Sequence, residues 1–320
     1  MKIAVIAHLA TYGNAPTLTR ALCELGHDAR LIISCRNLRD GGDYGFGAEI
    51  ECWQMQDNED LPKARQWAAD ADRIIIVTIP SLKPTRSIFA NGKLPAGAMI
   101  CSSSHLLKDV EINKWLIRDT GLKIFVQPHK HVYIRELEPN VYYPAIGLVD
   151  DNVAPNDKVA IGHTPGKPGR EKWKGTAEVR EAFEALGRTY GDPLSCTILP
   201  AMPHGEAIEA RRYFHIFVDQ VCPPYPVDGC PDYCGGLDKA GLEAMGAGCC
   251  VVTSGGPLTV GDEFPAPPVI TTHAGGLLGV LEGLVDNPDM VKKLGAASRR
   301  WVRAVCEPKT VAGRILAAIE

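Results

Sequence analysis

Short apolar runs recur along the chain, and polar loops or amphipathic segments separate them. The first three runs are residues 3–7, 29–34 and 73–79, all rich in Ile, Val, Leu or Ala. Between the first two, residues 16–25 have the spacing of an amphipathic helix that ends at Gly26, a residue suited to the position after a helix. A strand, a helix and a second strand in this order predict a parallel sheet.

This alternation continues to about residue 150 and then starts again. Two more strands are predicted at 98–101 and 123–127, and Asp150-Asp151-Asn152 marks the exit to a linker. The second half is predicted to contain strands at 158–162, 195–199, 215–221 and 249–253, and helices at 177–186, 205–214, 238–247, 274–285 and 288–305. We therefore expect an α/β protein of two domains, residues 1–150 and 151–320. Ligands of parallel sheets bind beyond the carboxyl ends of the strands, and a cleft between two domains is a common ligand site.

Length and composition agree with two globular domains. The chain has 320 residues, of which 45% are hydrophobic and 22% are charged, an ordinary composition for a folded protein. No stretch approaches the roughly 20 apolar residues that cross a bilayer, and the first apolar run is too short for a signal peptide. We therefore expect a cytoplasmic protein without a membrane span.

The cysteines do not indicate a disulfide framework. There are eleven, an odd number, and several lie in apolar segments, so we interpret them as reduced thiols. Cys222, Cys230 and Cys234 are near His204 and His215 in the sequence, but their spacing fits no common zinc site well. No metal site is expected.

A cationic, glycine-rich loop at residues 163–176 is the first candidate ligand-binding site. It follows a predicted strand, precedes a predicted helix and contains Lys167, Arg170, Lys172 and Lys174. A diphosphate needs positive charge and backbone that can approach closely, and a helix N-terminus adds oriented N–H donors. The loop matches neither the P-loop nor the GxGxxG pattern. A solvated connection without a ligand is the alternative.

A second candidate site is the segment from Gly235 to Thr253. Its sequence predicts a glycine turn, a helix of small residues that ends at Gly248, and a buried strand. Glu243 lies inside this otherwise apolar helix. Because burying an unpaired carboxylate is costly, Glu243 must be either salt-bridged or bound to ligand hydroxyls, such as the two hydroxyls of a ribose.

The run Gly-Leu-Glu-Ala-Met-Gly-Ala-Gly-Cys-Cys-Val-Val at 241–252 resembles the donor-site signature of the retaining GT-B glycosyltransferases, the group 1 and family 4 enzymes. Four other segments resemble this family in the right order. They are residues 21–29 (the first helix and its L-x-x-x-G-H-x-V exit), 143–147 (the interdomain segment), 174–176 (the Lys-Gly of the donor domain) and 213–220 (the strand before the signature).

The resemblance implies a GT-B fold, in which two Rossmann-like domains face each other across a cleft. Residues 1–150 would bind the acceptor and residues 151–320 the donor, and the last helix would return to the N-terminal domain. The implied reaction is metal-independent transfer of a sugar from a nucleotide-diphosphate sugar, such as a UDP-sugar, with no other cofactor.

The same resemblance assigns roles to residues of the second half. Arg170 and Lys174 would neutralise the donor diphosphate, and Glu243 would bind the donor ribose. The backbone amides of three consecutive residues would bind the phosphates or the sugar: Gly235, Gly236 and Leu237.

This chain departs from the family at Gly235, where the family often has a second glutamate that contacts the donor sugar. Asp232 or Asp238 could replace that carboxylate. The departure leaves the donor sugar open, and with it whether the reaction retains or inverts the sugar configuration. His215 is at a strand position usually held by Asp, and we interpret it as structural.

Two stretches of the N-terminal half, residues 73–108 and 120–135, contain several Lys and Arg residues and no Asp or Glu. Most of these cations follow predicted strand ends. An anionic acceptor would explain them, whether a phosphorylated carrier, an acidic glycan or a modified base in DNA. Lys83, Arg86 and Lys130 are then candidate acceptor-binding residues, and a solubilising surface is the alternative.

His8 and His105 each follow a predicted strand. A histidine with a near-neutral pKa can take a proton from an attacking hydroxyl, although a hydrogen-bonded structural role is the more common one. Ser102-Ser103-Ser104-His105 is an unusually polar strand exit, so His105 is the candidate catalytic base.

Two other functions compete with glycosyl transfer. A nucleotide-sugar epimerase shares the GT-B architecture and needs no second substrate. A non-catalytic nucleotide- or glycan-binding module would explain the missing carboxylate at Gly235.

Overall fold

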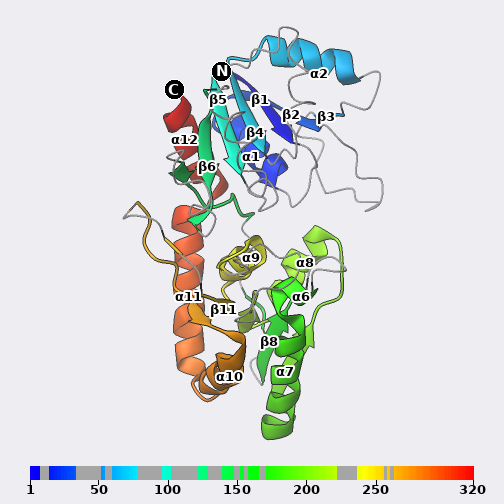
Figure 1. Cartoon of the computed structure of the whole chain (residues 1–320), viewed down its shortest axis with the longest axis vertical. Coiled ribbons are helices and arrows are strands. Elements are labelled where there is room, and N and C mark those ends of the chain that lie inside the picture. The colour runs from blue at the N-terminus through cyan, green and yellow to red at the C-terminus, as the bar shows by residue number, and fades with distance from the viewer. Residues whose placement is uncertain are drawn as a thin grey trace. The chain divides into compact units, whose positions relative to one another are not determined.

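The computed structural model describes residues 1–7, 14–33, 52–54, 60–77, 96–101, 121–128, 139–147, 152–154, 158–165, 171–221, 236–255, 258–259 and 263–320. Within these ranges, none of the helices has the length and apolar character that crossing a membrane requires. Contacts divide the chain into two units, each with its own parallel sheet (Figure 1). Unit 1 is Met1–Ala145 with Pro308–Glu320, and unit 2 is Ile146–Glu307.

The sheet of unit 1 has seven parallel strands in the order β3-β2-β1-β4-β5-β6-β7. They are β1 (Lys2–Ala7), β2 (Asp28–Ile33), β3 (Cys52–Gln54), β4 (Arg73–Val77), β5 (Gly97–Cys101), β6 (Lys123–Val126) and β7 (Asn140–Val141). The strand order reverses between β1 and β4, which makes this pair the topological switch point of unit 1.

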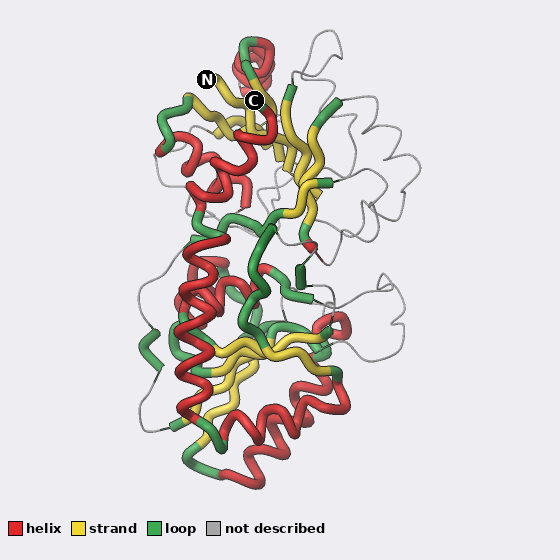
Figure 2. Tube along the Cα trace, turned by 90° about the vertical axis from the view of Figure 1, so that its left-hand side faces the viewer, coloured by secondary structure: helices red, strands yellow, loops and turns green. Residues whose placement is uncertain are grey.

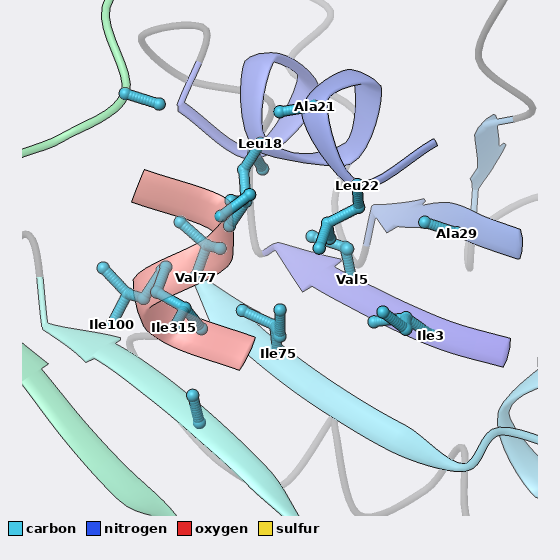
Figure 3. Close-up of a cluster of buried hydrophobic side chains, with 14 of the residues drawn as sticks. Ile3, Val5, Leu18, Ala21, Leu22, Ala29, Ile75, Val77, Ile100 and Ile315 are labelled. Atoms are coloured by element: carbon cyan, nitrogen blue, oxygen red, sulfur yellow. The ribbon is translucent and has the colours of Figure 1, made fainter. Parts of the chain in front are cut away.

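Helices α1 (Asn14–Glu24) and α12 (Pro308–Ile319) pack on one face of this sheet, and α2 (Asp60–Ala69) completes the described helices of unit 1. Figure 3 shows Leu18 and Leu22 of α1 and Ile315 of α12 directed at Val5 and Ile75 in the sheet. These side chains are all buried. The C-terminal helix is therefore part of the core of unit 1.

The sheet of unit 2 has five parallel strands in the order β12-β11-β10-β8-β9. They are β8 (Val159–His163), β9 (Leu194–Ile198), β10 (Ile216–Val218), β11 (Cys250–Ser254) and β12 (Ile270–Thr272). Its helical segments are α6 (Glu171–Lys174), α7 (Thr176–Tyr190), α8 (His204–Arg211), α9 (Lys239–Ala247), the 3-10 turn η5 (Ala274–Gly276), α10 (Leu277–Val285) and α11 (Pro288–Val305). The order reverses between β8 and β10.

Successive side chains of a strand point to opposite faces of the sheet, which shows what covers each face in unit 2. Ile161 and Val218 belong to a cluster with the apolar side chains of α7 and α10, so those helices cover one face. Phe217 lies between Ile216 and Val218 and therefore points to the opposite face. The guanidinium of Arg211 from α8 lies over its ring, 5.5 Å from the ring centre. Figure 2 shows helices on both sides of this sheet.

The predicted α/β class and parallel sheets are confirmed, and the predicted strands and helices that lie in the described ranges appear with ends shifted by a few residues. One strand is shorter than expected. The strand β10 stops at Val218, and the side chains of the next two residues, Asp219 and Gln220, bind Asp238 and Gly236. Six elements have no counterpart among the predicted ranges: the short elements β3, β7, α6 and β12, the internal helix α2 and the C-terminal helix α12.

Candidate functional site

The carboxyl ends of β8 and β10 bring polar residues together at the switch point of unit 2. His163 ends β8 and pairs in register with Val218, which ends β10. Thr164 follows the first strand, and Asp219 and Gln220 follow the second. In an open parallel sheet this edge is where a ligand is expected.

Lys174 lies at this edge between two carboxylates. Its Nζ is 3.2 Å from Oδ1 of Asp219 and 3.0 Å from Oδ2 of Asp238. The Asp219 side chain has no exposed surface, whereas that of Asp238 is 43% exposed. Burial would lower the pKa of Lys174, but the two carboxylates outweigh it and raise that pKa above its usual value. The ammonium group is therefore permanently charged and held in place.

Local sequence explains why Lys174 lies there. Gly175 adopts a left-handed conformation with φ of 66°, and a Cβ at this position would collide with the carbonyl oxygen of Val221. Val221 also donates its backbone N–H to the carbonyl of Lys174 at 3.1 Å. The close approach of these two segments requires glycine and sets the direction of the neighbouring lysine.

The imidazole of His163, at the end of β8, contacts both β10 and the start of α7. Its Nδ1 lies 2.8 Å from the carbonyl oxygen of Val218, and its Nε2 lies 2.9 Å from Oγ1 of Thr176. Burial lowers the pKa of His163 to about 4, against the effect of the hydrogen bond to Val218. A neutral, fully buried histidine is therefore part of the frame that supports the site.

The glycine turn of the second candidate segment is fixed by the strand ends. The carbonyl oxygen of Gly236 accepts hydrogen bonds from Nε2 of Gln220 at 2.7 Å and from Oγ1 of Thr253 at 2.9 Å. The backbone N–H of Gly236 donates to the carbonyl of Ser254, and Leu237 is buried. The turn that leads into α9 is thereby attached to the same edge of the sheet as Lys174.

Asp219 connects that turn to Lys174. Its Oδ2 accepts the backbone N–H of Asp238 at 2.8 Å, while its other oxygen binds Lys174. A Cβ at Gly241 would lie 2.7 Å from Oδ2 of Asp219, so only a residue without a side chain lets α9 lie this close. Asp238 is also the N-cap of α9, with its Oδ1 accepting the N–H of Lys239 at 2.8 Å.

Glu243 lies on the second turn of α9, buried among three basic side chains. Its Oε1 is 2.7 Å from Nε2 of His204 and 3.5 Å from Nζ of Lys239, and its Oε2 is 3.1 Å from Nη1 of Arg211. Burial would raise the pKa of Glu243, but Lys239, Arg211 and His204 together lower it to about 2. Of the two possibilities predicted for this residue, the salt-bridged one is therefore present.

Three of the predicted donor residues, Lys174, Gly236 and Leu237, lie together at the carboxyl edge of unit 2, and Glu243 is one helical turn further along α9. His215, predicted to be structural, accepts the backbone N–H of Ala160 through Nδ1 at 3.1 Å. Other predicted residues lie outside the described residues: Lys83, Arg86, His105, Lys130, Arg170 and Gly235, as do His8, Asp232, Cys222, Cys230 and Cys234.

The part of the chain that the structure describes contains no group of three or more His, Cys, Asp or Glu side chains that could hold a metal ion. Its thiols are free at Cys23, Cys196, Cys249, Cys250 and Cys306.

Sequence reasoning missed Asp219 as a partner of Lys174, and His204 and Arg211 as partners of Glu243. His204 and Arg211 are seven residues apart on α8, which puts both on one helix face, and this spacing was an available signal. Asp219, directly after a buried strand, was another. Thr164 was missed as well: its Oγ1 is buried without a hydrogen-bond partner in the described part of the chain.

No protein-family model matches this sequence, and no curated protein sequence matches it significantly. Solved structures do resemble it. Anabaena HepE in complex with UDP and glucose matches at 11% identity with a TM-score of 0.65, and 99% of each chain is covered. An α-glucosyltransferase solved with UDP and a 13-mer DNA containing an HMU base matches at 11% identity and TM-score 0.66, again over 99% of each chain.

A third similar structure is a putative UDP-N-acetylglucosamine 2-epimerase from Listeria monocytogenes. It has 14% identity and a TM-score of 0.55, and the match covers 100% of this chain and 96% of the other. Identities this low establish architecture and not activity. The two parallel sheets, their strand orders and the full-length structural match show that this chain has the GT-B fold, with two Rossmann-like units.

Proposed function

We propose that this protein is a glycosyltransferase that moves a sugar from a nucleotide-diphosphate sugar, most simply a UDP-sugar, to an acceptor. The observation that carries the proposal is the arrangement at the β8–β10 switch point. There a fixed lysine, a glycine turn and the start of α9 meet at one sheet edge. The GT-B structures that resemble the chain include proteins solved with UDP.

The donor diphosphate is assigned to Lys174 and to the backbone amides of Gly235, Gly236 and Leu237, with Arg170 as a second cation. A lysine ammonium has three donors, and Asp219 and Asp238 use two of those on Lys174. No described residue is recorded as taking the third, which is proposed to donate to a phosphate oxygen. Helix N-termini and glycine turns supply the amide donors that phosphates prefer.

The donor ribose is assigned to Glu243. A carboxylate offers about four acceptor positions. His204 and Lys239 lie at Oε1, and Arg211 forms an ion pair with Oε2 without making a hydrogen bond to it. A ribose hydroxyl is therefore proposed to donate to Oε2. The low pKa of Glu243 keeps the carboxylate charged at every physiological pH, and charged acceptors make the stronger hydrogen bonds.

The acceptor is assigned to the N-terminal half and is proposed to be anionic. Lys83, Arg86 and Lys130 would bind it, and His105 would accept the proton of its attacking hydroxyl. A phosphorylated carrier, an acidic glycan and a modified base in DNA all fit this charge. The proposed reaction needs no metal, because cations of the protein neutralise the diphosphate.

A nucleotide-sugar epimerase is the second candidate, and the structural match to a putative 2-epimerase supports it. A non-catalytic binding module is the third, because Gly235 replaces a carboxylate of the family signature. Release of free nucleotide diphosphate separates the three functions. A transferase releases it in proportion to acceptor, an epimerase changes the sugar without an acceptor, and a binding module does neither.

The test is a panel of nucleotide sugars incubated with the protein, with and without candidate acceptors and with and without a chelator. We expect acceptor-dependent release of nucleoside diphosphate that the chelator does not abolish. Turnover of the sugar without acceptor would favour the epimerase, and nucleotide binding without any turnover would favour the binding module.

A further inference from the structure

The two carboxylates that hold Lys174 differ in how far they are exposed to solvent. Asp219 has no exposed side-chain surface, and both of its oxygens are used inside the protein, one by Lys174 and one by the backbone of Asp238. Gly241 packs against it closely. The Asp238 side chain is 43% exposed and lies at the N-terminus of α9. Of the two, Asp238 is the one that a ligand can reach from solvent.

The carboxylate of Asp238 binds two groups of the kind that a phosphate binds. Its Oδ2 takes the ammonium of Lys174 at 3.0 Å, and its Oδ1 takes the backbone N–H of Lys239 at 2.8 Å. A cationic side chain and a helix N-terminal amide are the usual partners of a bound phosphate. The Asp238 carboxylate therefore occupies the position that a bound phosphate would take.

Around this position, Lys174 faces two carboxylates, those of Asp219 and Asp238. A diphosphate that bound Lys174 with both carboxylates in place would be repelled by both of them in a partly buried site. Departure of the Asp238 carboxylate removes its share of that repulsion.

We propose that Asp238 is a specificity-determining residue of the donor site, whose carboxylate occupies the phosphate position at Lys174 and α9 and must be displaced by the donor diphosphate. This inference rests on the proposed function. It follows that Asp238 lowers the affinity for every phosphorylated ligand of the site, more so for those that carry more charge, and leaves the binding of an uncharged nucleoside unchanged.

The experiment compares wild type with Asp238→Asn and Asp238→Ser by calorimetric titration with uridine, UMP, UDP and inorganic pyrophosphate. Asn and Ser are both good N-caps, so α9 keeps its start while the competing charge is lost. We expect UDP to bind about 10-fold more tightly to both variants than to wild type. The affinity for UMP should rise less, and the affinity for uridine should not change. Pyrophosphate, which has no base, should show the same increase in affinity as UDP.

The matched control is Asp192→Asn, which removes the same charge from an exposed residue just before β9. That position is at the amino edge of the sheet, opposite to the site, and its effect on UDP should be small because salt screens distant charges. Thermal unfolding of each variant checks that the fold is kept.

Equal or weaker UDP binding by both Asp238 variants would overturn the inference. So would weaker binding that appears only with Mg²⁺, since Asp238 would then hold a cation for the diphosphate. If wild type binds UDP but the variants bind it no more tightly, only the inference about Asp238 is wrong. If no protein binds UDP or pyrophosphate, the proposed function and the inference fail together.

Discussion

The ammonium group of Lys174 lies 3.2 Å from Oδ1 of Asp219, a carboxylate with no exposed surface at the end of the central strand of unit 2. A charged pair this deeply buried is expensive to break, because removal of one partner leaves the other charge without compensation. The same pair places the lysine where the proposed donor phosphates bind. Stability and binding are therefore coupled at this point, and experiments have to separate them.

Replacing Lys174 with Met should lower both stability and nucleotide affinity. The buried charge of Asp219 would lose its main partner, which costs about 3–5 kcal/mol, and the loss of one charge-assisted hydrogen bond should weaken nucleoside-diphosphate binding by about 1.5–3 kcal/mol. The double variant Lys174→Met/Asp219→Asn should recover stability in chemical unfolding but not affinity in calorimetry. Recovery of affinity by the double variant would show that Lys174 does not touch the ligand.

Replacing Glu243 with Gln should weaken nucleotide binding by about 1.5–3 kcal/mol, because the amide is a weaker acceptor for a ribose hydroxyl. Glu243→Ala is a poorer test, since it leaves Arg211 and Lys239 without their shared carboxylate. Glu184→Gln, at an exposed position of α7, is the matched control. Calorimetry with the best-binding nucleotide measures the effect, and unchanged affinity in folded Glu243→Gln would contradict the ribose assignment.

Stability should fall as the pH drops from about 6.5 to 4, in part through His163. Burial lowers the pKa of His163 to about 4 in the folded protein, so between these values the unfolded chain binds a proton that the native state does not. By linkage the free energy of unfolding then decreases with falling pH, by up to the order of 3 kcal/mol for this residue. Chemical unfolding of wild type and His163→Gln across this range measures the difference, which should vanish if His163 is protonated in the native state.

Gly175→Ala should destabilise the protein by more than the 1–2 kcal/mol that a left-handed conformation alone costs, because the new Cβ also meets the carbonyl oxygen of Val221. It should also weaken nucleotide binding by shifting Lys174. Gly187→Ala is the internal comparison: a Cβ there meets nothing within 4 Å inside α7, and alanine should stabilise the helix by about 0.5–1 kcal/mol. Similar melting temperatures for the two variants would contradict the account of Gly175.

The proposed anionic acceptor predicts a salt effect. Acceptor KM should rise with ionic strength, because exposed charges are screened over about 8–10 Å near physiological salt, while donor affinity should change less. Nucleic acid would show the steepest dependence, since each neutralised phosphate releases a counterion. The triple variant Lys83→Ala/Arg86→Ala/Lys130→Ala should reproduce the high-salt behaviour at low salt. A neutral acceptor, or an unchanged KM in the triple variant, would assign these residues to a solvated surface.

Much of the secondary structure was determined by the sequence itself. Strands such as β1 and β4 are apolar runs after their first residue, and α1 stops two residues before Gly26, which has a φ of 87°. Periodicity and glycine conformation depend on residues close together in the chain, so they can be read locally. The need of Glu243 for a partner was visible for the same reason, because it is a carboxylate inside an apolar helix.

Only the tertiary structure decided which residues pair with Glu243. Arg211 and Glu243 are on different helices, and whether their side chains meet depends on how α8 and α9 pack on the sheet. The joining of Lys174 to Asp219 likewise needs β10 to lie beside β8. The pairing of distant charges follows from the packing of whole elements, and no local pattern in the chain encodes it.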